Sequence, residues 1–209
     1  MTAIIDPALI DPALIDPVLA AAATPETVLG ALYFAGVAVF AATGALAAAR
    51  QKQDLVTFAF FAVVTGVGGG TLRDLLIGAP VFWVQDWRYF AVCLTAALVI
   101  WILAARPWRS GGRFRALLWL DAVGLAAYGV MGAAKAGAYG VAPLICIAMG
   151  ALTACFGGVV RDLLAGQPSI LLSREINVSA AILAATVFVA ASALGLPLWP
   201  AAFLGVVLG

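Results

Sequence analysis

Residues 65–84 read TGVGGGTLRDLLIGAPVFWV, and residues 153–172, which begin 88 positions later, read TACFGGVVRDLLAGQPSILL. The two stretches share the pattern Gly-Gly-x-x-Arg-Asp-Leu-Leu-x-Gly-x-Pro without a gap. Unrelated apolar helices would match by chance in leucine and alanine, but not in this order of glycine, arginine, aspartate and proline. The repeat extends upstream, where Gly36 and Gly44 pair with Gly124 and Gly132 at the same offset. The sequence therefore predicts two copies of one unit.

The composition is that of a membrane protein. Of the 209 residues, 65% are hydrophobic and only 10% are charged, whereas a soluble domain has about 25% charged residues. Several apolar runs approach the roughly 20 residues that cross a bilayer as a helix. We therefore predict an all-α polytopic membrane protein. The net charge of +1 excludes a strongly basic nucleic-acid binder, so no nucleic-acid partner is expected.

The side chains that metal sites and enzymes commonly use are scarce. The chain has no histidine, which excludes imidazole ligands and histidine acid–base catalysis. Cys93, Cys146 and Cys155 lie in apolar runs without the spacing of a metal site, and we expect them to be small packing residues. No nucleophile–base pair or nucleotide motif is present either. We expect no metal, no cofactor and no enzymatic activity.

The apolar runs divide the chain into four parts. Residues 1–26 carry proline at every fifth position from Pro7 to Pro17 and predict a flexible, mildly acidic tail. Helices are predicted over about 27–49, 55–77, 89–105, 116–134, 141–164 and 175–194, with a seventh beginning near Pro197. The first three-helix repeat then occupies 27–110, the second 111–195, and the start of the seventh helix 196–209. Because about 13 residues are too few to cross about 30 Å, we expect this last helix to be truncated.

Basic residues gather on one side of the predicted helices. The loops on this side carry Arg50, Lys52, Arg106, Arg109, Arg113, Arg115 and Arg174. Since the positive side of a membrane protein is cytoplasmic, the N-terminus is predicted outside and the C-terminus inside. Each repeat has three spans, an odd number, so the second copy must be inverted relative to the first. Inverted repeats occur in many proteins that move solutes between their halves.

Glycines cluster in both copies. Gly68, Gly69 and Gly70 lie in the second predicted helix, and Gly157 and Gly158 lie in the fifth. Each glycine costs a helix interior about 1 kcal/mol relative to alanine, so the clusters predict a local kink or an unwound turn. Carbonyl groups freed by a break are tolerated in a membrane mainly against protein or water. We therefore interpret these glycines as lining a water-filled path, with close helix packing as the alternative.

An arginine–aspartate pair follows each glycine cluster, Arg73-Asp74 in the first copy and Arg161-Asp162 in the second. Adjacent residues on a helix do not face each other, so each charge is expected to have a separate partner or to contact water. One interpretation is snorkelling to the membrane surface. The other is that the pairs hold the ends of the broken helices and line the two mouths of a path. The repeated order favours the second interpretation.

The fourth predicted helix carries two isolated charges. Asp121 lies six residues past Arg115, about 9 Å into the helix, and a carboxylate at that depth usually faces a partner or water. Because inversion places Arg161 on the same side, we predict an Asp121–Arg161 contact or a shared cation vestibule. The counterpart of Asp121 in the first copy is Tyr33, so the two halves differ chemically. Lys135 ends this helix on the outer side, where we expect it either to snorkel or to be a movable cation in a pore.

The doubled motif, the segment Phe40-Ala41-Ala42-Thr43-Gly44-Ala45, and Leu120-Asp121-Ala122-Val123-Gly124 with Lys135 resemble the prokaryotic trimeric intracellular cation (TRIC) channels. Each repeat of that family is also classified as a glycine-transporter domain. The resemblance covers about residues 27–205. It implies two inverted three-helix bundles plus a seventh helix, a homotrimer with one pore per protomer, and permeation by monovalent cations such as potassium and sodium.

The resemblance also implies roles for particular residues. The kinked, pore-lining helices of the family correspond to the segments with Gly68–Gly70 and Gly157–Gly158, and its basic residues near the kinks correspond to Arg73, Arg161 and Lys135. This chain departs from the pattern at Phe156, which stands where the first copy has Gly68. The short seventh helix is a second departure.

The function expected from the sequence is a passive potassium channel in the bacterial cytoplasmic (inner) membrane, with membrane lipids as further partners. A secondary transporter of a small solute such as glycine is the first alternative, because inverted repeats with broken helices suit it equally well. A structural or lipid-interacting membrane protein, in which glycine serves packing alone, is the second.

Overall fold

The computed structural model describes residues 25–104, 112–167 and 177–208. These ranges contain eight helices: α2 (Pro25–Arg50), α3 (Leu55–Leu76), α4 (Phe82–Gln85), α5 (Arg88–Ala104), α6 (Gly112–Ala138), α7 (Pro143–Leu164), α8 (Asn177–Ala193) and α9 (Leu198–Leu208). The short α4 is additional to the seven predicted helices. Most of the predicted tail, the arginines at 106 and 109 and the arginine at 174 lie outside the described residues, as do the side chains of the two arginines in the first turn of α6.

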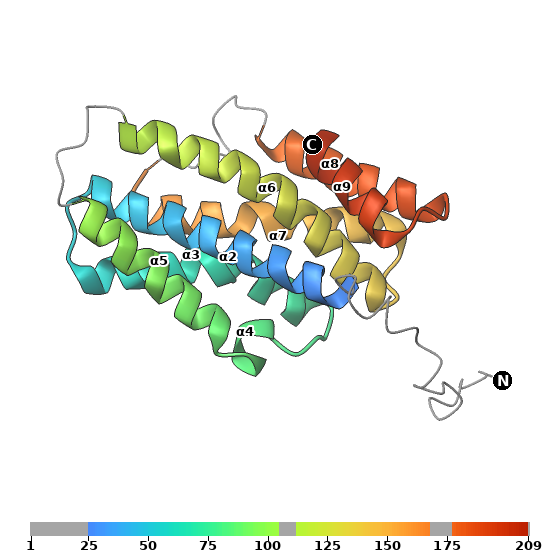
Figure 1. The fold of residues 1–209 in the computed structure, drawn as a ribbon, viewed down its shortest axis with the longest axis horizontal. Coiled ribbons are helices and arrows are strands. Elements are labelled where there is room, and N and C mark those ends of the chain that lie inside the picture. The colour runs from blue at the N-terminus through green and yellow to red at the C-terminus, as the bar shows by residue number, and fades with distance from the viewer. Residues whose placement is uncertain (1–24, 105–111, 168–176, 209) are drawn as a thin grey trace, which may run out of the picture.

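The long helices lie side by side along the long axis of the molecule (Figure 1). In the described part of the chain, three helical segments are long and apolar enough to cross a membrane: Tyr33–Arg50, Leu55–Leu76 and Pro143–Leu164. Arg88–Ala104 and Val178–Ala193 are shorter apolar helices. The protein is therefore an all-α polytopic membrane protein, as predicted.

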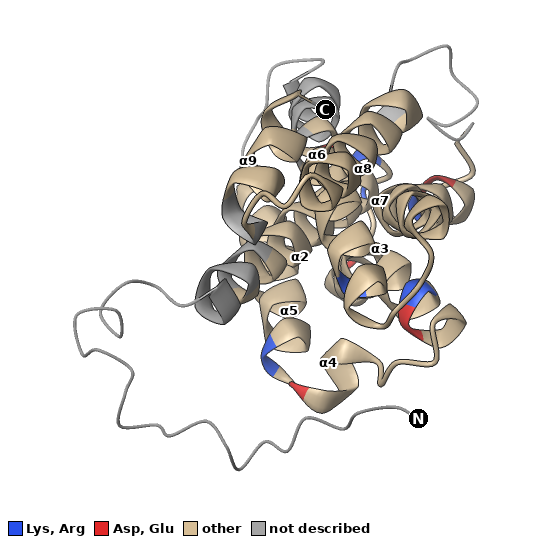
Figure 2. Ribbon diagram, turned by 90° about the vertical axis from the view of Figure 1, so that its right-hand side faces the viewer, with Lys and Arg blue, Asp and Glu red and all other residues tan. Residues whose placement is uncertain are grey.

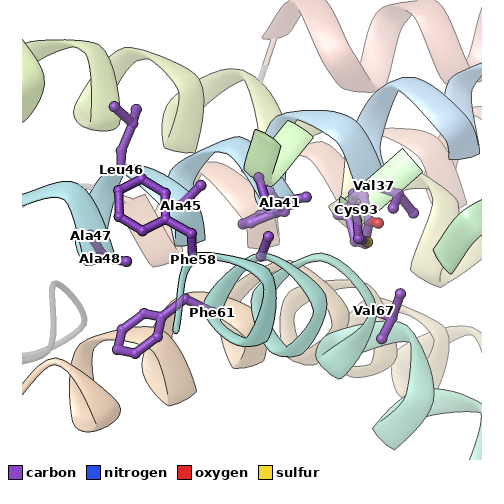
Figure 3. Close-up of a cluster of buried hydrophobic side chains, with 14 of the residues drawn as sticks. Val37, Ala41, Ala45, Leu46, Ala47, Ala48, Phe58, Phe61, Val67 and Cys93 are labelled. Atoms are coloured by element: carbon purple, nitrogen blue, oxygen red, sulfur yellow. The ribbon is translucent and has the colours of Figure 1, made fainter. Parts of the chain in front are cut away.

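Small residues fill the interface between α2 and α3. Ala41 and Ala45 are fully buried on α2, and they belong to the same apolar cluster as Phe58 and Phe61 on α3 (Figure 3). A Cβ added at Gly44 would clash with the carbonyl oxygen of Phe61. Glycine and alanine at these positions of α2 let the two backbones approach closely, as in many membrane helix pairs.

The outward faces of the bundle are apolar. On α5, Leu98, Trp101 and Ile102 are exposed in the single chain. Figure 2 shows Lys, Arg, Asp and Glu as a few short stretches on a bundle that is otherwise uncharged. A large exposed apolar surface is unstable in water and suits lipid or a neighbouring subunit.

Contacts between the two repeats are reciprocal, which shows that the second copy is inverted. Gly36 on α2 lies against the ring of Tyr128 on α6, and Gly124 on α6 lies against the ring of Phe40 on α2. The members of each pair exchange places under the 88-residue offset of the sequence. A two-fold axis produces such self-complementary contacts, because it brings the same patch of each copy onto the other. Together with the odd number of spans per copy, this relation gives two inverted three-helix repeats followed by α9.

Both motif helices end in the same way. Gly78, with φ +67°, follows α3, and Gly166, with φ +60°, follows α7. The next amide donates back to the carbonyl of Asp74 in the first copy (2.8 Å) and of Asp162 in the second (3.0 Å). This left-handed cap needs glycine because a side chain would clash with its own backbone. It accounts for the last glycine of the repeated motif.

Candidate functional site

The two glycine clusters meet where α3 crosses α7. A Cβ added at Gly69 would clash with the carbonyl oxygen of Thr153, and one added at Gly157 would clash with the carbonyl oxygen of Thr65. Gly69 and Gly157 are equivalent in the repeat, as are Thr65 and Thr153. Each helix therefore contributes one glycine notch and one carbonyl to a symmetric backbone contact. Any larger residue at either glycine would push the helices apart.

Of the predicted kink or unwound turn at these glycines, the unwound turn is wrong, and the kink stays a prediction. Helix α3 is continuous from Leu55 to Leu76, and α7 is continuous from Pro143 to Leu164. The glycines do not break the helices because their lost propensity, about 1 kcal/mol each, is offset by the close helix contact that they permit. The packing interpretation of Gly69 and Gly157 is thus the one that the structure supports.

The remaining glycines of the motif have different surroundings. A Cβ at Gly70 would overlap the ring of Phe82, at 2.6 Å. A Cβ at Gly158 would lie 3.6 Å from Nη2 of Arg161, an ordinary contact. Around Gly68 nothing lies within 4 Å of an added Cβ, although the residue is half-buried. The space beside Gly68 is therefore not used by packing among the described residues.

A first group of charges, the Lys135 cluster, consists of Tyr33, Arg73, Asp74 and Lys135. The Arg73 and Asp74 side chains are completely buried and pair directly, with Nη2 2.7 Å and Nε 2.9 Å from Oδ1. Lys135 Nζ lies 2.8 Å from the other carboxylate oxygen, Oδ2. Arg73 Nη1 also donates to the Tyr33 hydroxyl at 3.3 Å. Three helices, α2, α3 and α6, meet in this cluster.

Asp74 also organises the chain that follows α3. Its Oδ2 accepts a hydrogen bond of 3.0 Å from the backbone amide of Phe82, at the start of α4. The Phe82 ring lies below Lys135, with Nζ 5.9 Å from the ring centroid. The carboxylate of Asp74 therefore joins two cations and a loop at one end of α3.

A second group, the Asp121 cluster, consists of Thr43, Asp121, Arg161 and Asp162. Arg161 Nη1 lies 2.6 Å from Asp121 Oδ1, and Nε lies 2.8 Å from Asp162 Oδ1. The same Nη1 donates to the Thr43 hydroxyl at 3.1 Å. The predicted Asp121–Arg161 contact is confirmed. It is the inverted-repeat counterpart of the Arg73–Tyr33 contact, since Tyr33 and Asp121 are equivalent positions.

Two sequence-based expectations about these charges are wrong. Snorkelling does not describe them, because the Arg73 and Arg161 side chains are at most 1% exposed. Each arginine also pairs with the aspartate next to it, which the rule for neighbouring helix positions argues against. That rule concerns the directions of Cβ atoms. An arginine side chain is long enough to turn back along the last turn of its helix and reach the adjacent carboxylate.

The Lys135 side chain is only 20% exposed and is directed to Asp74 rather than to the surface. The snorkelling interpretation of this residue is therefore wrong as well. Lys135 is held inside the bundle beside the carboxylate of Asp74, and the alternative, a movable cation in a pore, stays a prediction.

Two buried polar atoms lack a hydrogen-bond partner among the described residues, Thr65 Oγ1 and Arg161 Nη2. Buried polar groups without a partner are costly and commonly indicate an ordered water molecule. A cavity of about 110 Å³ opens near this end of the bundle. It is lined by Ala47, Arg50, Gln51, Asp162, Ala165 and Gln167. The Asp121 cluster thus borders a space that admits water.

Sequence reasoning missed several polar contacts. Thr43 was quoted only within a motif, yet its hydroxyl is fully buried and accepts from Arg161. The Tyr128 hydroxyl donates to the carbonyl of Gly66 at 3.0 Å. Gln51 donates through Nε2 to the carbonyl of Ala165, which connects the end of α2 to the end of α7. A lone hydroxyl within an alanine-rich helix is the one signal that could have identified Thr43.

The three cysteines are free; Cys93 and Cys146 are buried and Cys155 is half-buried, which fits packing. Within the described ranges no group of three or more Cys, Asp or Glu side chains is arranged to hold a metal ion. The charged side chains of the two clusters instead form ion pairs with one another.

The fold and the site define a polytopic membrane protein in which two inverted repeats each bury an arginine–aspartate pair. The family model described as Glycine transporter matches residues 31–105 and 118–193, once for each repeat. The chain belongs to this family, and its fold is that of the TRIC channels.

Solved structures with this fold include a TRIC trimeric intracellular cation channel orthologue from Rhodobacter sphaeroides. It is 46% identical, with a TM-score of 0.82, covering 86% of this chain and 92% of that chain. A prokaryotic TRIC channel in 0.5 M KCl is 25% identical, with a TM-score of 0.79, covering 88% and 93%.

Sequence relatives are membrane proteins. The UPF0126 inner membrane protein YadS of Escherichia coli K12 is 36% identical over 174 residues, 82% of this chain and 83% of the relative. A UPF0126 membrane protein of Vibrio cholerae is 39% identical over 166 residues, 77% of this chain. The matched region spans slightly less than two thirds, 66%, of the Vibrio protein.

Proposed function

We propose that this protein is a passive channel for monovalent cations, potassium and sodium among them, with a conduction path inside each protomer. The observation that carries the proposal is the pair of buried charge clusters at the two ends of a fold shared, at a TM-score of 0.82, with a TRIC cation channel. Buried ionisable groups in membrane helices are costly and are retained mainly where ions or solutes pass.

The proposed path runs between the two clusters, beside the crossing of α3 and α7. Gly68, with open space around it, and Gly158, next to the unpartnered Arg161 Nη2, are the glycines proposed to border it. Gly69, Gly70 and Gly157 hold neighbouring elements close and act on the path by shaping it. Arg73, Asp74 and Asp162 are proposed to line the mouths together with Asp121.

Lys135 is proposed to be the movable charge at its end of the path. In the structure its ammonium group is held by Asp74, 2.8 Å away. A cation in that position repels other cations, so conduction requires that it be displaced or that a permeating ion replace it at Asp74. The Lys135–Asp74 ion pair would therefore take part in the opening of the channel.

Assembly and placement are proposed from the same similarity. A homotrimer in the bacterial inner membrane fits the trimeric channel from Rhodobacter sphaeroides and the inner membrane relative from Escherichia coli. The exposed apolar faces of α5 would contact lipid or neighbouring protomers. The end that carries the basic residues Arg50 and Lys52 is proposed to face the cytoplasm, with the N-terminus outside.

Reconstitution in planar bilayers tests the channel. Unitary currents carried by potassium and sodium are expected from the purified protein. Saturable uptake of glycine into proteoliposomes, without such currents, would replace the channel by a transporter. We do not favour the transporter because the solved neighbours are cation channels. The absence of both activities in folded protein would favour a structural role.

A further inference from the structure

A cavity of about 370 Å³, which we call the α6–α8 cavity, lies between α6, α7 and α8 near the loop that joins α6 to α7. Its lining includes the buried residues Ala133, Cys146 and Phe188, which are at most 5% exposed. It also includes the exposed residues Gly137 and Ser192. The cavity therefore reaches from the core of the second repeat to the outside of the bundle, and no residue of the two charge clusters lines it.

The first repeat fills the corresponding region with large side chains. Under the 88-residue offset, Cys146 corresponds to Phe58. Ala134, which also lines the cavity, corresponds to Leu46. Phe58 and Leu46 are at most 2% exposed and belong to the core of the first repeat (Figure 3). Smaller residues at these two positions therefore help to open a cavity in the second repeat where the first repeat is packed.

The α6–α8 cavity offers few groups that could bind water or an ion. The described residues that line it include no charged side chain, and their one hydroxyl group is that of Ser192. The Cys146 thiol already donates to the carbonyl of Val141, at 3.2 Å. A buried water molecule needs about two to four polar partners, and apolar cavities stay dry. The cavity therefore suits an apolar occupant.

The surface around the opening is apolar as well. Leu144, at the start of α7, is 75% exposed, and Leu194, just after α8, is 80% exposed. The helices that bear these residues, Pro143–Leu164 and Val178–Ala193, are apolar along their length. In a bilayer, lipid chains surround such a surface, so an acyl chain can enter the cavity without crossing water.

The volume favours an acyl chain over a side chain inserted by a neighbouring protomer. An engineered cavity of about 150 Å³, made by shortening one leucine, stays dry and binds benzene. The α6–α8 cavity, at about 370 Å³, is more than twice as large, so one inserted side chain would leave much of it empty. Empty space forfeits dispersion contacts along the lining, whereas a flexible chain of methylene groups can follow an irregular groove.

We propose that the α6–α8 cavity binds one acyl chain of a membrane lipid. The cavity recognises the chain and not the headgroup, because its described lining carries no charge and the nearby cation Lys135 is held by Asp74. The lipid fills in the second repeat the space that Phe58 and Leu46 fill in the first. This inference concerns the packing of the fold and does not depend on the channel function.

The test uses the full chain in proteoliposomes that contain phosphatidylcholine with a diazirine on one acyl chain. After illumination, mass spectrometry of peptides identifies the residues that the lipid has modified. We expect labelling at the cavity residues Phe188 and Ser192 of α8, with labelling of the exposed face of α5 as the internal reference. Cys146→Phe and Ala134→Leu supply the side chains of the first repeat. Each should lower the α8 labelling severalfold relative to α5, and α8 itself carries neither substitution.

A matched control adds the same ring outside the cavity. Ala148 is an exposed residue of α7 that does not line the cavity and corresponds to the exposed Phe60, so Ala148→Phe should leave the labelling unchanged. Circular dichroism and gel filtration check folding, and Ala134→Leu decides if Cys146→Phe does not fold.

Two results would overturn the inference. Labelling of α8 that neither folded variant lowers would mean that lipid only touches the surface. Labelling of α5 without labelling of the α8 cavity residues would mean that another occupant, such as a neighbouring protomer, covers the groove. Currents do not enter these measurements, so the channel is tested separately.

Discussion

Alanine substitutions at Gly68 and Gly69 make the same chemical change one residue apart, and we expect opposite effects on stability. At Gly68 an added Cβ has nothing within 4 Å, so the variant gains helix propensity, at most about 1 kcal/mol, without a clash. At Gly69 the added Cβ would overlap the carbonyl oxygen of Thr153 on α7. Since a backbone carbonyl cannot rotate away, α3 and α7 must separate.

The size of the Gly69→Ala effect follows from two opposing terms. Overpacking at a close contact costs typically 1–3 kcal/mol, and the contact here is at the upper end because backbone faces backbone. The propensity gain offsets about 1 kcal/mol of it. The net expectation is a loss of about 2 kcal/mol for Gly69→Ala, and a gain approaching 1 kcal/mol for Gly68→Ala.

Unfolding by SDS in mixed micelles, followed by tryptophan fluorescence, measures both variants against the parent. Gly157→Ala is the matched repeat, because its Cβ would overlap the carbonyl oxygen of Thr65. It should lose about as much stability as Gly69→Ala. A Gly69→Ala protein as stable as Gly68→Ala would refute the close crossing as the reason for the glycine.

Three further substitutions test other parts of the structure. Replacing Asp121 by Ala should cost about 3–5 kcal/mol in the same unfolding assay, because it leaves buried Arg161 with one of its two carboxylates. Replacing Asp54 by Ala should lower stability, because it removes the side-chain cap of α3. Hydrogen bonds from Thr57 lower the pKa of Asp54 in the folded protein. The Asp54 carboxylate therefore stabilises the fold above its unfolded pKa near 3.8, and this stabilisation is lost as the pH falls through the lower folded pKa. Replacing Gly68 by Phe, the residue at 156 in the second repeat, should leave the protein folded and reduce unitary current severalfold, because the ring would occupy the open space beside the proposed path.

Each of these three predictions has its own control. Asp121→Asn keeps an acceptor for Arg161 and should cost less than Asp121→Ala; no loss in either variant would contradict a stabilising contact between Asp121 and Arg161. Asp54→Ser keeps a capping oxygen and should retain stability at low pH, where the parent loses its cap. Gly137 is an exposed residue of α6, so Gly137→Ala should leave the current unchanged. Full current in folded Gly68→Phe would remove Gly68 from the path.

The fold was predictable because the repeat encodes it twice. The second helix was predicted over 55–77 and runs over 55–76, and the fifth was predicted over 141–164 and runs over 143–164. The inversion followed from an odd number of spans, which is a matter of counting. The Asp121–Arg161 contact could be placed because inversion brings both residues to the same side.

The detailed role of the glycines could not be read from the chain. A glycine weakens any helix, but whether the helix breaks or packs more closely depends on which surface faces it, here the carbonyl oxygens of Thr153 and Thr65. The direct Arg73–Asp74 pair was missed for a similar reason, since the conformation of a long side chain depends on what else surrounds it. Thr43 was missed because its partner lies 118 positions away.

The symmetric crossing of α3 and α7 has an evolutionary consequence. A half-length ancestor that carried both the glycine notch and the threonine carbonyl would already be self-complementary across a two-fold axis in the membrane plane. Two such polypeptides, inserted in opposite orientations, would meet through this same surface before any gene fusion. Duplication then freed each half to change independently. One such change is the difference between Tyr33 in the first copy and Asp121 in the second. A dimer of identical halves could not have made this change in one half alone.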